Sequence, residues 1–332
     1  MYRKIVNFML AGCMTLLVLA GCTSAGKSPV TTPAPKEDIS VRIGCMKGPT
    51  AIGMIRLLSE SDAGNASNTY EYTVAGAADE LSAALIKGEL DIASVPCNLA
   101  SVLYHKTEGQ IVTAAINTLG VLYIVEGGNT IKSTADLAGK TIYSTGQGTT
   151  PEYTLRYLLT CAGLDPDKDV TIEYKSEASE VVAALAQNPS ATAMLPQPYV
   201  TAAMNNNPDL RIALDITKEW ENYADNTVVT GVIVARKDFI EEHPAVFANF
   251  LTEYQASAEY ANSNIDDTAA LLEKYDIFKA AIAKKAIPYC NVVYITGTEM
   301  KESAMAYLKV LFDQNPAAVG GSLDEGMFYI EE

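Results

Sequence analysis

The chain has 332 residues, of which 40 are acidic and 24 are basic, and hydrophobic residues make up 48% of it. This length and apolar content suit two cores of ordinary size better than one oversized core, so we expect two lobes. The net charge of −16, with no basic cluster after the extreme N-terminus, argues against nucleic-acid binding, which requires a positive surface.

The N-terminus has the pattern of an export signal. Arg3 and Lys4 precede an apolar run at residues 5–19, which ends in Leu19-Ala20-Gly21-Cys22. The run is shorter than the ~20 residues that cross a bilayer, so we interpret residues 1–21 as a signal peptide, with a transmembrane anchor as the alternative. The tetrapeptide resembles the lipobox of bacterial lipoproteins, which implies lipidation of Cys22. Residues 22–39, rich in proline and small residues, are expected to be a flexible tether.

The first part of the mature chain alternates strands and helices. Strands are predicted at 40–46, 70–74 and 90–95, and each is followed by a small-residue turn and a helix. Thr50 and Asn98 are candidate N-caps for two of these helices. This order implies a parallel sheet whose carboxyl edge collects the loops. Two further strands, at 111–115 and 119–125, are expected to close this part at residue 128.

A glycine loop, Gly146-Gln147-Gly148-Thr149-Thr150, lies between a predicted strand and a helix. We expect Thr150 to be the N-cap of that helix and Pro151 its first residue. Free amides at the carboxyl end of a strand favour a ligand site there. The loop lacks a complete G-x-G-x-x-G, so a tight turn without a ligand is the alternative.

The second part repeats the alternation and then becomes helical. A short helix is predicted at 133–137, strands at 170–174, 192–195 and 211–216, and helices at 179–186 and from 196 to 204. The buried strand predicted at 227–235 could return to the first sheet. Helices are predicted at 244–262, 268–275 and 298–312.

Four cysteines remain after the tether: Cys45, Cys97, Cys161 and Cys290. Their spacing shows no disulfide framework and no C-x-x-C, so buried free thiols are favoured. Cys45 and Cys97 end two strands that could be neighbours, and they are the pair that could form a disulfide. An enzyme is not expected, since H-E-x-x-H, G-x-S-x-G and metal-ligand spacings are all missing, and no metal or cofactor is expected either.

Several sequence strings together resemble a known family. They are Val41-Arg42-Ile43-Gly44, Gly88-Glu89-Leu90-Asp91-Ile92-Ala93, the run from Thr134 to Ile142 and His243-Pro244. With the lipobox, they resemble the solute-binding lipoproteins of ABC importers, of the type that binds nitrate, sulfonates, taurine or thiamine precursors. The resemblance covers residues 41–312.

This resemblance implies an α/β, type II periplasmic binding protein-like fold with two lobes, mostly parallel sheets and two hinge crossovers. The crossovers are expected near 126–130 and 230–236. Lobe 1 would comprise residues 40–128 plus 232–332, and lobe 2 residues 129–231. The solute is trapped when the lobes close around a hinge.

If the carboxyl edges of both sheets face one cleft, polar groups from both lobes are expected to bind the solute. They are Lys47, Gly48, Pro49, Thr50, Asn98, Thr118, Gly146, Gln147, Gly148, Thr149, Thr150, Gln197, Tyr199 and Thr230. No arginine lies in a predicted cleft loop, and Glu152 would either oppose an anion or complement the helix dipole. The resemblance implies a sulfonate, a nitrate-like anion or a heteroaromatic vitamin precursor as the solute, and the missing arginine favours a neutral or heteroaromatic one at least as much as an anion.

The same resemblance implies an ABC permease with its cytoplasmic ATPase as partners. The protein is expected to be a monomer, held on the extracytoplasmic face of the cell membrane by the lipid on Cys22. A surface sensory or adhesive lipoprotein with the same fold and no importer is the alternative.

Overall fold

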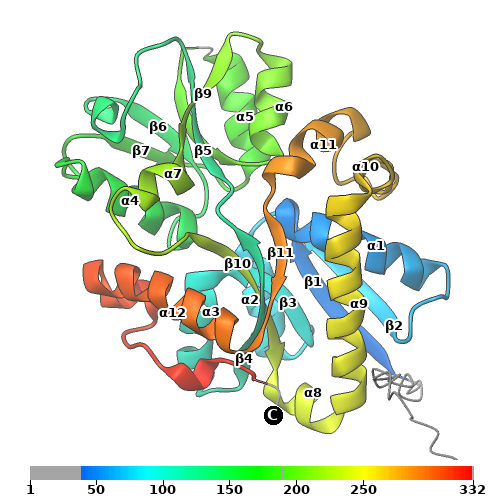
Figure 1. Ribbon diagram of the computed structural model, residues 1–332. Coiled ribbons are helices and arrows are strands. Elements are labelled where there is room, and N and C mark those ends of the chain that lie inside the picture. Colours follow the sequence, from blue (N-terminus) through cyan, green and yellow to red (C-terminus); the bar gives the residue numbers. More distant parts are fainter. Residues whose placement is uncertain (1–38, 189, 331–332) are drawn as a thin grey trace, which may run out of the picture. The chain divides into compact units, whose positions relative to one another are not determined.

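The computed structural model describes residues 39–188 and 190–330. Cys22, the predicted signal peptide and residues 22–38 of the predicted tether lie outside this range. The described residues belong to one compact unit, which contains a six-stranded and a five-stranded sheet (Figure 1). Helices flank both sheets, so the unit is built of two α/β lobes.

The six-stranded sheet has the order β11-β4-β10-β3-β1-β2. Strand β1 pairs in parallel with β2 and β3, whereas β10 is antiparallel to β3 and β4, and β11 is antiparallel to β4. The predicted parallel pairing of the first three strands and the return of the strand predicted at 227–235 to this sheet are thus confirmed. Strand β11 was not predicted. The strands are β1 (Ser40–Met46), β2 (Thr69–Ala75), β3 (Ile92–Pro96), β4 (Ile111–Leu119), β10 (Val229–Arg236) and β11 (Val292–Ile295).

The helices of this lobe lie on the two faces of its sheet. Buried residues of α1 and α9 form one hydrophobic cluster, and those of α2, α3 and α12 belong to another. The long helices each present apolar residues at helical spacing to one side. The helices are α1 (Pro49–Asp62), α2 (Ala78–Lys87), α3 (Cys97–Lys106), α8 (Lys237–Glu242), α9 (Pro244–Ser263), α10 (Ile265–Lys274), α11 (Ala280–Ala286) and α12 (Gly297–Gln314), with short 3₁₀ turns at Ile287–Tyr289, Pro316–Val319 and Glu325–Met327.

The five-stranded sheet has the order β7-β6-β8-β5-β9. Strand β6 is parallel to β7 and β8, and β5 is antiparallel to β8 and β9. Both sheets are therefore mixed rather than mostly parallel, because each receives a strand that arrives from the other lobe. The elements are β5 (Leu122–Gly127), β6 (Thr141–Ser144), β7 (Thr171–Tyr174), β8 (Thr192–Pro196), β9 (Leu210–Asp215), α4 (Thr150–Cys161), α5 (Ala178–Gln187), α6 (Tyr199–Asn206), α7 (Ile216–Glu221) and the 3₁₀ turn Thr134–Leu137.

The chain changes sheets earlier than the sequence suggested. Strand β4 lies in the six-stranded sheet and β5 in the other, so the first crossover is at Gly120 and Val121 rather than at 126–130. The second lies between the end of α7 at Glu221 and the start of β10 at Val229 rather than at 230–236. The Gly127-Gly128 pair, interpreted as a boundary, instead ends β5 inside the second lobe.

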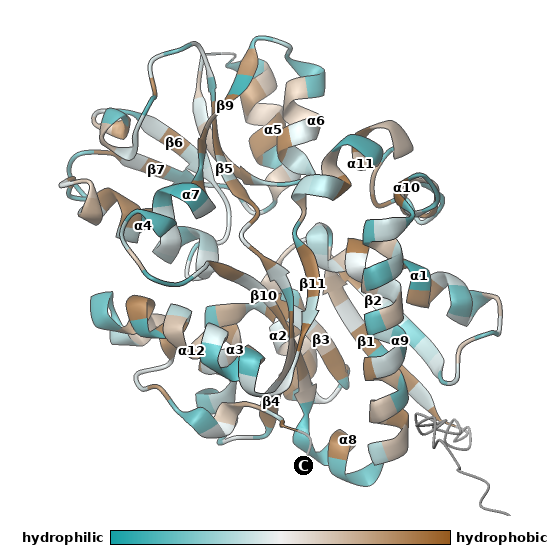
Figure 2. Cartoon of the chain, viewed as in Figure 1, coloured by the Kyte–Doolittle hydropathy of each residue, from teal (hydrophilic) through white to brown (hydrophobic). Residues whose placement is uncertain are grey.

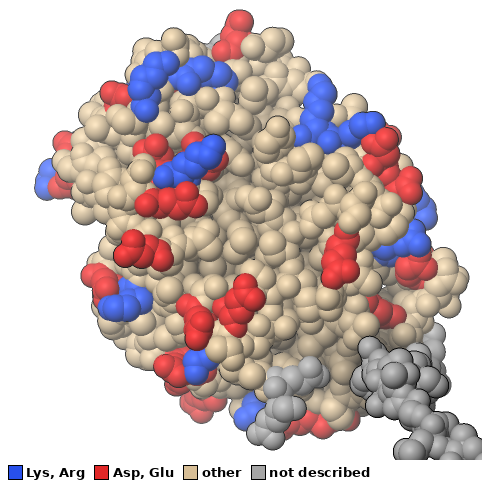
Figure 3. Space-filling model, in the orientation of Figure 1, with Lys and Arg blue, Asp and Glu red and all other residues tan. Residues whose placement is uncertain are grey.

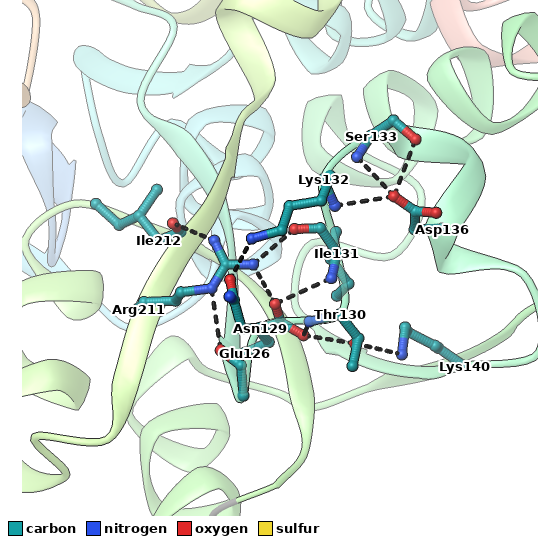
Figure 4. Close-up of polar contacts among 11 residues, drawn as sticks. Glu126, Asn129, Thr130, Ile131, Lys132, Ser133, Asp136, Lys140, Arg211 and Ile212 are labelled. Carbon is teal, nitrogen blue, oxygen red and sulfur yellow. Dashed lines mark hydrogen bonds and ion pairs between the residues drawn. The ribbon is translucent and has the colours of Figure 1, made fainter.

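Glu126, which was expected in a hinge, anchors the loop that follows β5. Its side chain is 4% exposed, pairs with Arg211 of β9, and accepts hydrogen bonds from Ile131 N at 3.0 Å and the Thr130 hydroxyl at 2.8 Å (Figure 4). Burial opposes ionisation, but these hydrogen bonds and the Arg211 guanidinium outweigh it and hold the pKa of Glu126 below its usual value. This segment is therefore fixed within the second lobe.

Hydrophobic residues concentrate along the central strands, as the brown colour along β5 and β10 shows (Figure 2). Cys45, Cys97 and Cys290 are buried among them, Cys161 is half-buried, and all four are free thiols, as the sequence favoured. Burial raises the pKa of Cys45 to about 12. On the face shown in Figure 3, acidic and basic side chains are interspersed rather than gathered by sign.

Candidate functional site

A cavity of about 720 Å³ lies between the two lobes. From the six-stranded lobe it is lined by the turns after β1, β2 and β3 and the first turns of the helices that follow them. From the five-stranded lobe it is lined by the corresponding turns after β6, β7 and β8. The carboxyl edges of the parallel strands of both sheets thus meet at one cavity, which is where α/β sheets bind ligands.

Eleven of the fourteen predicted site residues line this cavity. They are Lys47, Gly48, Pro49, Thr50, Thr118, Gly146, Gln147, Gly148, Thr149, Tyr199 and Thr230. Tyr199 also joins the lobes, because its hydroxyl donates a hydrogen bond to the carbonyl of Lys47 at 3.2 Å. Burial and the nearby charge of Glu177 raise the pKa of Tyr199, so it stays a neutral donor.

Asn98, Thr150 and Gln197 do not line the cavity. Asn98 lies within the first turn of α3 and is fully buried; its amide donates to the carbonyls of Ala318 at 2.9 Å and Gly148 at 3.3 Å. The Thr150 hydroxyl donates to the Asn98 side-chain oxygen at 3.2 Å. Asn98 and Thr150 therefore position the glycine loop against the other lobe instead of facing the cavity.

Gln197 has a capping role at the start of α6. Its side-chain oxygen accepts hydrogen bonds from the hydroxyl of Thr201 at 2.8 Å and from the Thr201 backbone at 3.3 Å. The turn that contains it still reaches the cavity, because its neighbours Pro196 and Tyr199 line the wall.

The glycine loop differs from the expected loop with free amides. Gly146 and Gly148 have φ values of 73° and 76°, which explains the two glycines. However, Gly148 N donates to the Glu152 carboxylate at 2.7 Å, and Thr149 N donates to the carbonyl of Gly146 at 3.0 Å. Thr149 rather than Thr150 is the N-cap residue of α4. The anion position at this helix start is thus occupied by the protein's own carboxylate.

Glu152 is itself held in place from the opposite side. Arg156 donates to its second oxygen at 2.8 Å and to Asp167 at 2.8 Å. Burial opposes the charge on Arg156, but these two carboxylates outweigh it and raise the pKa of Arg156. The ion pair fixes the carboxylate toward the loop. Glu152 therefore complements the helix dipole at the start of α4, one of the two roles that the sequence suggested, and its effect on an anionic ligand stays a prediction.

Two threonine hydroxyls on the strands next to the crossovers have no hydrogen-bond partner among the described residues. Thr118 of β4 and Thr230 of β10 both line the cavity, and both hydroxyl oxygens are buried. The register between β10 and β4 shifts between Val229 and Gly231, which makes Thr230 the extra residue of an irregularity. Such irregularities re-aim side chains next to binding sites. Each of these residues therefore has an unused hydroxyl donor and acceptor next to the cavity.

Sequence reasoning missed much of the cavity wall. Both α2 and α3 contribute residues at positions i, i+3, i+4 and i+7: Asp79, Ser82, Ala83 and Ile86, and Leu99, Val102, Leu103 and Lys106. The apolar periodicity of α3 is visible in the sequence, but periodicity alone does not distinguish a face in the core from a face at a cavity. In the structure Leu103 is buried, whereas Leu99 and Val102 are half-buried at the cavity.

The charges of the wall are few and mixed. The wall includes three lysines, Lys47, Lys106 and Lys175, and two acids, Asp79 and Glu177, and none of the arginines in the described residues lines the cavity. The sequence identified only Lys47, because residues 175–177 follow β7 and come to the cavity through the tertiary fold. The described residues contain no group of three or more side chains that could hold a metal ion.

A model of the family described as the phosphonate periplasmic substrate-binding proteins of ABC transporters matches residues 67–285, about two thirds of the chain. The chain belongs to this family. It is therefore a periplasmic, extracytoplasmic solute-binding protein of an ABC transporter, as the sequence strings suggested. The family and fold are those of transport-associated binding proteins rather than enzymes. No curated protein matches the sequence.

Solved structures show the same fold as this binding protein. An ABC transporter structure from Parabacteroides distasonis is 25% identical, with a TM-score of 0.72 over 89% of this chain and 100% of that one. The aliphatic sulphonate-binding protein SsuA of Escherichia coli is 20% identical, with a TM-score of 0.69 over 87% and 92%. The nitrate-binding protein NrtA of Synechocystis is 14% identical, with a TM-score of 0.64 over 86% and 84%. In the described part of the binding protein, no helix is long and apolar enough to cross a membrane.

Proposed function

We propose that this binding protein is a lipoprotein that captures a small organic solute between its two lobes and delivers it to an ABC permease driven by a cytoplasmic ATPase. The observation that carries the proposal is the cavity of about 720 Å³, lined by turns of both lobes. Because each lobe contributes part of the wall, closure around the hinge couples binding to a change of shape. The protein acts as a monomer, held at the cell membrane by a lipid on Cys22.

The solute class follows from the wall and from the relatives. SsuA binds aliphatic sulphonates and NrtA binds nitrate. A sulfonate, a nitrate-like anion or a heteroaromatic vitamin precursor therefore forms the first panel to test. The wall has no arginine, and an arginine fork is the usual partner of a doubly charged anion. Singly charged or neutral members of the panel are expected to bind best.

The test is ligand-dependent thermal stabilisation of the protein without its signal peptide. A true solute should stabilise the folded protein by RT ln(1 + [L]/Kd), so the melting temperature should rise with the concentration of the solute. Thr230→Val, which removes an unpartnered cavity hydroxyl without changing the shape, should weaken binding about fivefold, equivalent to ~1 kcal/mol for one neutral hydrogen bond.

Thr113→Val is the matched control. Its hydroxyl is also buried without a partner in the described structure, but Thr113 does not line the cavity. This variant should bind the solute as the unmodified protein does. Equal weakening by both substitutions, or no stabilisation by any solute in the panel, would contradict the proposal. Lipid anchoring is tested separately by labelling with a radioactive fatty acid, which Cys22→Ser should abolish.

A further inference from the structure

The cavity extends beyond the interlobe cleft into a groove between α2 and α3. The two helices follow parallel strands and share one face of the six-stranded sheet, and both begin at its carboxyl edge. They therefore run side by side, and the groove between them leads from the cleft along the lobe. Leu99 lines its inner end and Lys106 its outer end, seven residues apart on α3, which is about 10 Å along a helix.

The walls of this groove are apolar where they meet. Ala83 and Ile86 of α2 face Leu99 and Val102 of α3 across the same cavity. Ile86 is 44% exposed, and it is the one exposed large hydrophobic residue among those described that lines the cavity. Exposed apolar surface that continues a binding cavity marks ligand contact, because covering it with an apolar group releases water.

The polar groups lie at the inner end. Thr118 and Thr230 lie there with solvent-shielded hydroxyls that have no partner among the described residues, and the charged residues Lys47, Lys175, Asp79 and Glu177 line the same end. Glu152 already accepts the hydrogen bond of Gly148 N in the glycine loop, so the start of α4 is not open to an anionic head. A neutral or singly charged head group that accepts hydrogen bonds fits this end of the cavity. The apolar groove, in contrast, offers a compact anion no favourable contact.

We propose that the groove between α2 and α3 binds the apolar tail of the solute. The solute class is then an elongated amphipathic molecule with a small polar head in the cleft and an unbranched aliphatic chain of up to about 10 Å between the helices. This inference rests on the proposed solute-binding function and names the ligand class of the same site.

The test uses two series of straight-chain probes with two to eight carbons, carboxylates and primary amides, titrated calorimetrically against the protein. In at least one series the Kd should fall about fourfold with each added methylene, the fold-change of ~0.8 kcal/mol per buried CH₂, until the chain fills the groove. Comparison of the two series shows whether the head is charged or neutral.

Ala83→Phe blocks the groove from an exposed helix position and should remove the dependence on chain length while short probes still bind. Glu80→Phe is the matched control, because it adds the same side chain to α2 outside the cavity and should leave the dependence intact.

Three results would overturn the proposal. If short and long probes bind equally, the groove takes no tail, and the solute-binding function stands unaffected. If Ala83→Phe leaves the chain-length dependence unchanged, the tail lies elsewhere. If no probe of either series binds, the tail proposal is wrong, and the solute-binding function is judged by the broader thermal panel and the Thr230→Val comparison.

Discussion

Removing the Glu152 carboxylate should both loosen the glycine loop and create an anion site. In the native protein this carboxylate accepts a hydrogen bond from Gly148 N at 2.7 Å and pairs with Arg156 at 2.8 Å. A hydrogen bond to a charged group contributes about 1.5–3 kcal/mol. The lower half of that range applies to Glu152→Ala, because the loop lines the cavity and water can reach the freed N–H. The partly exposed ion pair adds little.

We therefore expect Glu152→Ala to lose about 2 kcal/mol of unfolding free energy, and a melting temperature lower by about 4 °C for a chain of this size. The freed amide at the start of α4, beside Arg156, should then bind sulfate. Calorimetric scans in rising sulfate should show saturable stabilisation of the variant but not of the native protein, with chloride at equal ionic strength as the control. The reasoning is refuted if sulfate stabilises both proteins equally, or if the variant melts within 1 °C of the native protein.

Three further outcomes are expected. The pKa of Glu126 is lowered in the folded state, so its contribution to stability is present above the usual carboxyl pKa of about 4.3 and is lost as pH falls through the folded-state pKa. In urea unfolding, the stability difference between the native protein and Glu126→Gln should therefore be largest near pH 7 and shrink below about pH 5. Asn98→Ala breaks the hydrogen bond to Ala318 and leaves a buried carbonyl without that donor, which should lower the unfolding free energy measured in urea by about 2 kcal/mol. Unchanged stability would contradict the structural role of Asn98. Maleimide labelling followed by peptide mapping should modify the half-buried Cys161 first, and equally fast labelling of the buried thiols Cys45, Cys97 and Cys290 would argue against their burial.

Local signals were sufficient where one segment determines its own structure. The turn-and-helix pattern after each of the first three strands predicted the parallel sheet, because apolar periodicity and small-residue turns act within a few residues. The same pattern placed Lys47, Thr50 and the glycine loop at the carboxyl edge of their sheets. Lys47, Thr50 and residues 146–149 of the loop line the cavity, and their contact with a solute stays a prediction.

Two predictions were wrong, the lobe boundary and the free loop amides, because each relied on a local pattern where a more distant contact decides the structure. Gly127-Gly128 looked like a lobe boundary, yet β5 pairs with β8 and β9, and pairing with distant strands cannot be read from a turn. The loop amides looked free, because the sequence alone does not show that Glu152, one helical turn on, reaches back to Gly148.

By itself the sequence determined the α/β class, the family strings and the strand ends that carry polar groups, and the export signal stays a prediction. Only the tertiary structure decided which polar groups face the cavity. Asn98 donates its amide to the carbonyl of Ala318 and Gln197 accepts from Thr201, whereas the hydroxyls of Thr118 and Thr230 have no partner among the described residues. The physical reason is that a side chain's partners come from segments up to 220 residues away, as between Asn98 and Ala318, and no local pattern encodes which of them arrives.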